Sequence, residues 1–429
     1  MGLICVTALL LRVGYVFGLE HPTTIGGDAY VYHFGAQLLV HGKGFIDPYA
    51  HNIVGQVHQT AQHPPLYTLA LAVPSALGLG TFLDHQLWSC VIGTATVGLV
   101  AVVGRRLGGP RVGLLAAGLA AVYPDIWISD AMVAAETLAL LTTVLVLWGA
   151  YRFWDRPSPR SAAVLGVACA IAALTRAEAA LLLPLVLLPW AVATRRTGLR
   201  RRAVLVAVAA LAAAITLGPW VGYNLARFDR PVLVTSGLDL ALVQANCDQT
   251  YYGAQTGYYS FACIPAVPAP RGDESDDAAY FHQFALRYIT HHESRVPFVA
   301  FARLGRTWGF YHPLGQIEVD SYLQGWNLPA AQAGLAMYAL LVPAAAAGLM
   351  VLRRRRIAVS PLVATVLTVS AAGVLTFGQT RYRLTAEATV VLLAAVAVDW
   401  CWTQQRWLRS ANGPGAGGDR SPGALPGGG

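Results

Sequence analysis

The chain has 429 residues, of which 55% are hydrophobic and 12% are charged, and its mean hydropathy is +0.51. The charged fraction is about half that of a soluble domain and long apolar runs recur, so the sequence predicts a polytopic membrane protein. The net charge of +8 comes mostly from arginines in short loops, a pattern typical of membrane topology, and no nucleic-acid partner is expected.

The N-terminal stretch, residues 3–19, is apolar from its start. It lacks a basic leader and a small-residue cleavage site, so we expect a retained first span rather than a removed signal. A long outer loop, 20–85, follows it and contains a predicted interfacial helix over 30–40. The apolar stretch 66–79 is short and interrupted by proline, which indicates an interfacial or re-entrant helix that does not cross the bilayer.

The fold class expected is an all-α membrane protein with about ten transmembrane helices, interfacial helices and a small outer loop domain. The expected spans are 3–19, 86–104, 112–123, 132–151, 162–174, 179–193, 203–223, 330–352, 357–377 and 386–402. Four arginine clusters share one face if 66–79 does not cross, and the positive-inside rule assigns that face to the cytoplasm. Both termini are then cytoplasmic, and the arginine-rich, lysine-poor composition favours the inner membrane of a bacterium.

This topology divides the chain into four parts. They are an N-terminal transmembrane module (1–223) that includes the first outer loop, an outer loop domain (224–329), C-terminal helices (330–409) and a Gly/Pro-rich disordered tail (410–429). Cys247 and Cys263 lie together in the outer domain, where an oxidising compartment favours a disulfide over two free thiols. The tyrosines of the same domain are suited either to stacking on sugar rings or to an interfacial aromatic belt.

Several arginines break the topology rule because they fall on the outer face, where a carboxylate, Asp28, also lies. Asp28 follows the first span, and Arg176, Arg381, Arg383, Arg303 and Arg306 lie in outer turns or at a return to the membrane. A guanidinium forks onto two phosphate oxygens, so several outer arginines beside a carboxylate loop indicate an anionic lipid substrate. The alternatives are headgroup anchoring and local pairing, such as Arg176 with Glu178. Arg12, inside the first span, either snorkels or pairs within the bundle.

Five segments carry a family resemblance that extends over nearly the whole chain. They are Asp28-Ala29-Tyr30, His63-Pro64-Pro65-Leu66-Tyr67, Ala134-Ala135-Glu136-Thr137, Leu174-Thr175-Arg176-Ala177-Glu178 and Arg381-Tyr382-Arg383-Leu384-Thr385-Ala386-Glu387. In this order they resemble the motifs of polytopic C-type glycosyltransferases, namely the protein O-mannosyltransferases and the aminoarabinose lipid A transferases. Three positions depart from the family: Ala29 replaces a second acid, His63 replaces a lysine, and Gln62 replaces a zinc-contacting glutamate.

The resemblance implies transfer of a sugar from a polyprenyl-phosphate donor to a hydroxyl of a glycan, lipid or protein acceptor on the outer face. Asp28 and Glu136 are the expected catalytic carboxylates, with inversion at the anomeric carbon. The expected contacts to the lipid phosphate and sugar are His63, Tyr67, Arg176, Arg381 and Arg383. No cofactor is firmly predicted; a divalent metal at Asp28 with first-loop histidines is an open alternative. A transporter or flippase for lipid-linked sugars is the alternative function.

Overall fold

The computed structural model describes residues 1–19, 25–194, 197–265 and 272–411, and these residues are predominantly α-helical. Within these ranges, β structure is limited to an isolated antiparallel bridge between Ile46 and Gln59. The predicted all-α membrane fold is therefore confirmed. Of the expected disordered tail, residues 412–429 lie outside the described part of the chain, and the last helix continues to Ala411.

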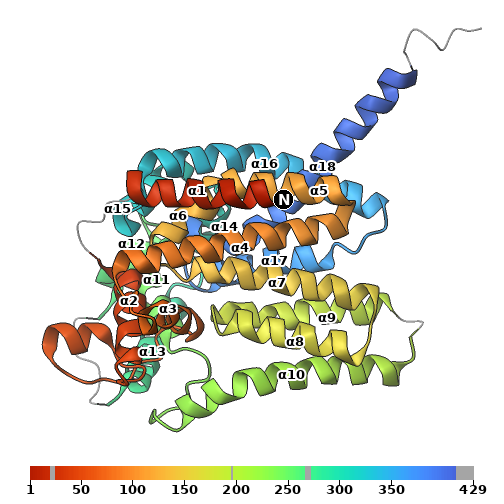
Figure 1. Cartoon of the computed structure of the whole chain (residues 1–429). Helices are drawn as coiled ribbons and strands as arrows, with labels where there is room; N and C mark the ends of the chain where they lie inside the picture. Colours follow the sequence, from red (N-terminus) through yellow and green to blue (C-terminus); the bar gives the residue numbers. More distant parts are fainter. Residues whose placement is uncertain (20–24, 195–196, 266–271, 412–429) are drawn as a thin grey trace, which may run out of the picture.

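Long apolar helices form the body of the molecule and run along a common direction (Figure 1). A helix overlaps each of the ten expected spans: α1 (Gly2–Gly18), α4 (Phe82–Gly108), α5 (Pro110–Val122), α7 (Glu136–Asp155), α8 (Pro159–Ala173), α9 (Leu182–Ala193), α10 (Leu199–Leu225), α16 (Leu328–Arg354), α17 (Ser360–Leu375) and α18 (Thr380–Ala411). Among the described helices, five are long and apolar enough to cross a bilayer, or six if one bent pair counts as a single span. The number of ten crossings stays a prediction.

The bent pair consists of α5 and the short helix α6 (Pro124–Ala131), which meet at an angle of 51°. Pro124 occupies the first turn of α6, where its missing N–H costs nothing but continuation of α5 is prevented. The bend turns two carboxylates, Asp125 and Asp130, toward the interior of the bundle, where both are nearly inaccessible to solvent.

The central element of the bundle is α18, which packs against α5, α7, α16 and α17. Its middle turns are fully buried among apolar neighbours, as expected for a helix surrounded by other helices. Consequently, the start of α18 is held rigidly at the end of the bundle, where Arg381 and Arg383 occupy its first turns.

Most helices of the two outer loops gather at one end of the bundle, on the left in Figure 1. These are α2 (Gly27–Val40), α3 (Leu66–Ala76), α11 (Gly237–Ala245), α12 (Asp248–Tyr251), α13 (Glu274–His291) and α15 (Pro313–Gln324). The short connections α4–α5, α7–α8, α9–α10 and α16–α17, which carry the arginine clusters, lie at the opposite end. This separation agrees with the expected topology, although which end faces the cytoplasm stays a prediction.

The two outer loops are joined to each other by Arg227, just beyond the end of α10. Its guanidinium donates to the carbonyl oxygens of Phe45 at 2.9 Å and Thr60 at 2.7 Å. Glu274, at the start of α13, accepts a hydrogen bond from the backbone N–H of Ala61 at 2.8 Å. The outer end of the bundle is therefore one connected assembly rather than two independent loops.

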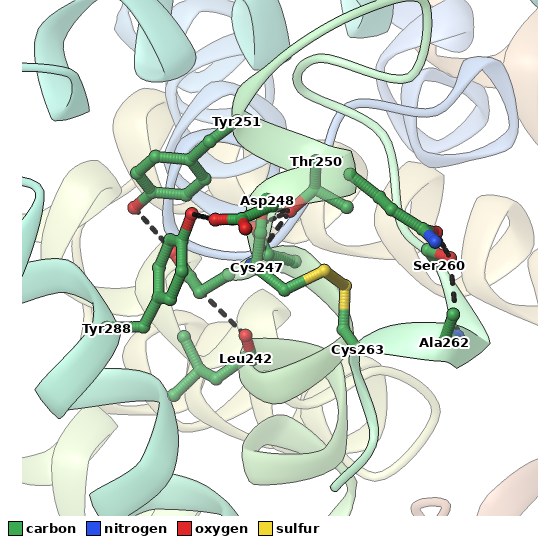
Figure 2. The surroundings of a disulfide bond; sticks show 12 residues. Leu242, Cys247, Asp248, Thr250, Tyr251, Ser260, Ala262, Cys263 and Tyr288 are labelled. Carbon is green, nitrogen blue, oxygen red and sulfur yellow. Dashed lines mark hydrogen bonds between the residues drawn. A yellow bond between two sulfur atoms is a disulfide. The ribbon is translucent and has the colours of Figure 1, made fainter.

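A disulfide joins Cys247 and Cys263 in the second outer loop, with 5.4 Å between their Cα atoms (Figure 2). The closed loop ends with η3 (Phe261–Cys263) and lies near α14 (Val296–Trp308). Its tyrosines Tyr251 and Tyr258 are 1% exposed, so these two rings belong to the packing of the domain and not to an open stacking surface.

Candidate active site at the loop end of the bundle

Asp28 lies in the first turn of α2, and its side chain keeps 31% of its surface exposed. The carboxylate forms an ion pair with the guanidinium of Arg381, which comes from the first turn of α18. His63, just before α3, places its Nε2 atom 3.7 Å from the other carboxylate oxygen. Residues 353 positions apart in the chain thus meet at one point.

Glu136, the first residue of α7, is the second carboxylate of this site and is nearly buried. Its Oε1 atom lies 3.3 Å from Nε of Arg381 and accepts a hydrogen bond from Nη1 of Arg176 at 2.6 Å. Arg176 also donates to Glu178 at 2.5 Å. We call Asp28, Glu136, Arg176, Glu178 and Arg381 the rim cluster; its two arginines are shared among three carboxylates.

Aromatic rings surround the rim cluster. The guanidinium of Arg176 lies over the ring of Tyr382 at 4.7 Å, and His63 contacts the ring of Tyr32 at 4.9 Å. Arg176 and Glu178 also line a small cavity, together with alanines, Leu182 and four threonines of α7, α17 and α18: Thr143, Thr365, Thr368 and Thr385. The cluster therefore has aromatic rings as neighbours and borders a small cavity of mixed polar and apolar lining.

Tyr67 was expected to contact the substrate, but the structure does not support this. Its side chain is fully buried on α3, its hydroxyl is hydrogen-bonded to Oγ of Ser89 at 2.8 Å, and its ring packs edge-on against Tyr32 at 5.0 Å. Tyr67 therefore supports α2 from behind and presents no free polar group to a substrate.

Electrostatics keeps Asp28 ionised. Burial alone would raise the pKa of this carboxyl, but the positive charge of Arg381, with smaller contributions from His63 and Arg176, outweighs burial and lowers the pKa well below its usual range. Burial also lowers the pKa of His63, and the nearby Asp28 offsets this only in part. At pH 7 the imidazole is consequently neutral, so in the free protein His63 is not the cation expected for a phosphate site.

The charge balance of the rim cluster follows from these states. Two guanidinium groups face three carboxylates, so with His63 neutral the cluster holds one negative charge in excess. A phosphate that enters must compete with Asp28 or Glu136 for Arg381, and it adds further negative charge. Proton uptake or a cation would offset that charge.

Arg383 was also expected to bind phosphate, but it lies outside the rim cluster. Its guanidinium is 1% exposed and pairs with Glu387 of its own helix and with Asp125 of α6 at 2.7 Å. The ring of Tyr338 covers it at 3.5 Å. Because both charged partners are in place and solvent is excluded, this arginine links α18 to α6 and α16, and the small cavity that it lines lies beside α15 rather than at the rim cluster.

Arg303 and Arg306 of α14 are likewise occupied. Arg303 donates to backbone carbonyls of Ala245 and Val374, and Arg306 donates to those of Ala254 and Thr256. Burial lowers the pKa of Arg303 to about 10, which leaves it charged at pH 7. These two arginines fasten the second outer loop and are not directed at an anionic lipid.

Arg12 pairs within the bundle, one of the two alternatives open for it. Its Nε atom donates to Asp130 at 2.7 Å, and the two side chains are 0% and 1% exposed. Gly93 of α4 makes room for the pair, because a Cβ atom at this position would lie 2.0 Å from an oxygen of Asp130. This ion pair joins α1 and α6 where both pack against α4, far from solvent.

A chain of polar side chains fastens α2, and hence Asp28, to α3 and α4. The Nδ1 atoms of His33 and His85 lie 3.0 Å apart, and His85 Nε2 lies 2.8 Å from Oγ of Ser75, which donates to the carbonyl of Leu71. At the other end, Gln37 lies 3.2 Å from His33 and donates to the carbonyl of Gly80. Both imidazoles are nearly inaccessible, and burial lowers the pKa of His33.

A metal site at Asp28 gains no geometric support from the described residues. Among them, one group of three side chains has ligand atoms close enough to hold an ion, and it is Asp229, Asp273 and Asp276 in the outer loops. At the rim cluster, guanidinium groups lie between the carboxylates, and His63 is the only first-loop histidine in the described contacts of Asp28.

With this geometry established, comparison with known proteins finds a family profile that matches part of the chain. Residues 62–220 match the sequence profile of the dolichyl-phosphate-mannose-protein mannosyltransferases. The resemblance to C-type glycosyltransferases drawn from the motifs is thereby confirmed, and this matched part contains His63, Glu136 and Arg176. No curated protein sequence matches the chain.

A solved archaeal enzyme shares the fold. The oligosaccharyltransferase of Archaeoglobus fulgidus, tethered to an acceptor peptide, is 12% identical with a TM-score of 0.56, over 97% of this chain and 51% of its own. The same enzyme in complex with zinc and sulfate is 15% identical with a TM-score of 0.53, over 95% of this chain and 50% of its own. ArnT from Cupriavidus metallidurans bound to undecaprenyl phosphate is 16% identical with a TM-score of 0.45, over 92% of this chain and 77% of its own. The chain spans about half the length of the archaeal oligosaccharyltransferase.

Two neighbours of the rim cluster had no assigned role in the sequence-based site. Gln324, the last residue of α15, accepts a hydrogen bond from Nη1 of Arg381 at 2.9 Å. Tyr382 lies in the same motif as Arg381 and covers Arg176. For Tyr382 the motif itself was a signal, whereas no pattern in the sequence around Gln324 indicated its contact.

Proposed function

We propose that this chain is an integral-membrane glycosyltransferase that moves a sugar from a polyprenyl-phosphate donor to an acceptor hydroxyl. The observation that carries the proposal is Arg381, whose guanidinium bridges Asp28 and Glu136 in a partly open cluster beside Arg176. The match of residues 62–220 to the profile of the dolichyl-phosphate-mannose-protein mannosyltransferases supports the same donor class, a sugar on a polyprenyl-type phosphate. Neither the family match nor the structural matches favour the transporter alternative.

The roles of the side chains follow from their charges. A departing phosphate develops negative charge, which Arg381 and Arg176 would stabilise. When the phosphate binds Arg381 in place, it offsets the positive charge that acts on Asp28, so the pKa of Asp28 rises and it becomes a better proton acceptor for the acceptor hydroxyl. Glu136 would hold Arg176 and orient the donor. The acceptor attacks from the side opposite the phosphate, so the reaction inverts the anomeric carbon.

The site is proposed to face outward from the inner membrane, with both termini in the cytoplasm. The separation of the arginine-rich connections from the loop end supports this orientation. The acceptor class, whether glycan, lipid or protein, is left open, and a divalent metal is not required by the geometry of the rim cluster.

A transfer assay tests the proposal. The purified full chain, in lipid nanodiscs, is given a polyprenyl-phosphate sugar with a labelled sugar and a panel of hydroxyl acceptors. We expect label in the acceptor with inverted configuration by NMR, undiminished by EDTA. Movement of labelled lipid across liposomes without any transfer would support the transporter instead.

A further inference from the structure

The loop closed by the Cys247–Cys263 disulfide is fastened to the segment that begins α18. The carbonyl of Gly257 accepts a hydrogen bond from the N–H of Gly378 at 2.8 Å, three residues before Arg381. Gly257 has φ +80°, and a Cβ atom there would lie 2.8 Å from the backbone nitrogen of Arg303. Only glycine fits at this approach to α14, so the path of the loop is closely determined.

Two successive tyrosines of this loop contact α15. The hydroxyl of Tyr258 donates to Asp320 at 2.9 Å, and the hydroxyl of Tyr259 accepts from the amide of Gln324 at 3.0 Å. Asp320 and Gln324 are four residues apart and therefore lie on the same face of the helix. Tyr258 and Asp320 are at most 1% exposed, so water does not compete for their contact.

The same face of α15 contacts the start of α18. Gln324 Oε1 accepts from Nη1 of Arg381 at 2.9 Å, and Gln379 Nε2 lies 3.5 Å from Asp320 and 3.4 Å from the hydroxyl of Tyr258. A guanidinium carries its N–H groups in a rigid plane. Contacts from Asp28, Glu136 and Gln324 at different edges therefore determine the direction in which Arg381 points.

We propose that Gln324 and Tyr259 are positioning residues that hold Arg381 in the orientation needed to bind the donor phosphate, and that the Cys247–Cys263 disulfide keeps Tyr259 in place for this task. This inference rests on the proposed function, because it assigns the phosphate to Arg381. Gln324 connects the two regions: its amide nitrogen binds Tyr259 of the disulfide-closed loop, and its amide oxygen binds Arg381 of the rim cluster.

The test measures the donor KM of variants that lack one tyrosine hydroxyl of this loop. The full chain is used, in lipid nanodiscs. Tyr259→Phe removes the acceptor of Gln324, and Gln324→Met removes both of its hydrogen bonds at similar length. We expect each to raise the KM for the polyprenyl-phosphate sugar about fivefold, the worth of one hydrogen bond, with little change in kcat. Tyr251→Phe is the matched control: its hydroxyl bonds to Asn246, away from α15, so KM should not change.

The disulfide is tested in the same assay. Replacing both cysteines by serine should raise the donor KM to a similar extent, and dithiothreitol should raise it in the wild type but not in the double variant. Tyr259→Phe added to Gln324→Met should raise KM no further, because the two residues act in series. If the KM increases of the two single variants multiply in the double variant, the positioning role is overturned. It is also overturned if the variants lower the melting temperature but leave the KM unchanged.

A structural measurement separates this inference from the proposed function. In a cryo-EM structure of the Gln324→Met variant, the guanidinium of Arg381 should turn away from its position between Asp28 and Glu136. If it does not move, the positioning role is wrong even where transfer is observed. If the wild type transfers no sugar but Arg381 does move in the variant, the positioning role holds and the proposed function fails.

Discussion

Two groups of ion pairs in this molecule, those at the rim and those in the bundle interior, differ in access to solvent. At the rim, Asp28 is 31% and Arg381 17% exposed, and two arginines serve three carboxylates. In the interior, the pairs Arg12–Asp130 and Arg383–Glu387 are at most 1% exposed. The interior pairs are inaccessible to a ligand, whereas the rim pairs can be exchanged for one.

The difference shows that an arginine near the end of a span is not by itself a sign of a binding site. A fully buried pair costs desolvation that its own attraction must offset, so removal of one partner strands a charge. A partly exposed pair is held more weakly, because water screens it and replaces either partner at lower cost. The following predictions test this contrast between chemistry at the rim and stability in the interior.

Asp28→Asn should have the largest effect. Loss of the proton acceptor is expected to lower kcat about 10³-fold in the transfer assay, while the melting temperature in detergent changes little. Asp239→Asn, an outer-loop aspartate paired with His282, is the control and should keep full activity. Near-normal turnover of Asp28→Asn would remove Asp28 from the reaction.

Asp130→Ala should act on stability instead. The stranded Arg12 is expected to lower the free energy of unfolding by about 3–5 kcal/mol, measured in detergent by denaturant titration. Arg12→Met combined with Asp130→Leu should restore most of this loss, because no charge is left buried. If the single variant unfolds like the wild type, the contrast between the two regions is wrong.

Gly93→Ala tests the space around the interior pair. The added methyl would overlap Asp130, so we expect a loss of about 1–3 kcal/mol in unfolding free energy. Gly98→Ala, on the same helix α4, meets no atom within 4 Å and should be neutral or slightly stabilising. Equal effects of the two substitutions would show that helix propensity, not the ion pair, decides the outcome.

The smallest effect concerns proton uptake at His63. Its pKa is lowered by burial, and it faces Asp28, Glu136, Arg176 and Arg381, so the ring is neutral at pH 7. A bound phosphodiester raises that pKa, so donor affinity should increase as the pH falls from 7.5 toward 6, by at most about tenfold per unit. His63→Lys stays charged and should flatten the dependence, measured as donor KM against pH. A flat wild-type profile would contradict proton uptake.

Much of this architecture could be predicted from the sequence. Apolar runs located the helices because length and hydropathy decide what lies in a bilayer. The motifs brought Asp28, Glu136, Arg176 and Arg381 into one hypothesis, and the structure places them in contact. For these four residues, the residue type and its place near a helix end were enough to predict that they share one site.

Other features depend on contacts that no local pattern encodes. Arg381 and Arg383 were expected to act together in a short turn, but α18 already begins at Thr380, and residues two apart on a helix point to different faces. One therefore reaches the rim and the other the interior. The pairing of Arg12 with Asp130 joins residues 118 positions apart and depends on the bend between α5 and α6, and so could not be read from either segment alone.

The polar chain that fastens α2 has a single consistent arrangement of hydrogens. Because Ser75 gives its hydrogen to Leu71 and Gln37 gives one to Gly80, the hydrogens run in one direction from Gln37 through His33 and His85 to Ser75. If either imidazole took up a second proton, two N–H groups would face each other, and one hydrogen bond of the chain would break. Acidification should therefore weaken the polar chain that fastens α2 to α3 and α4. The position of the Asp28 carboxylate, which α2 carries, should then become less well defined.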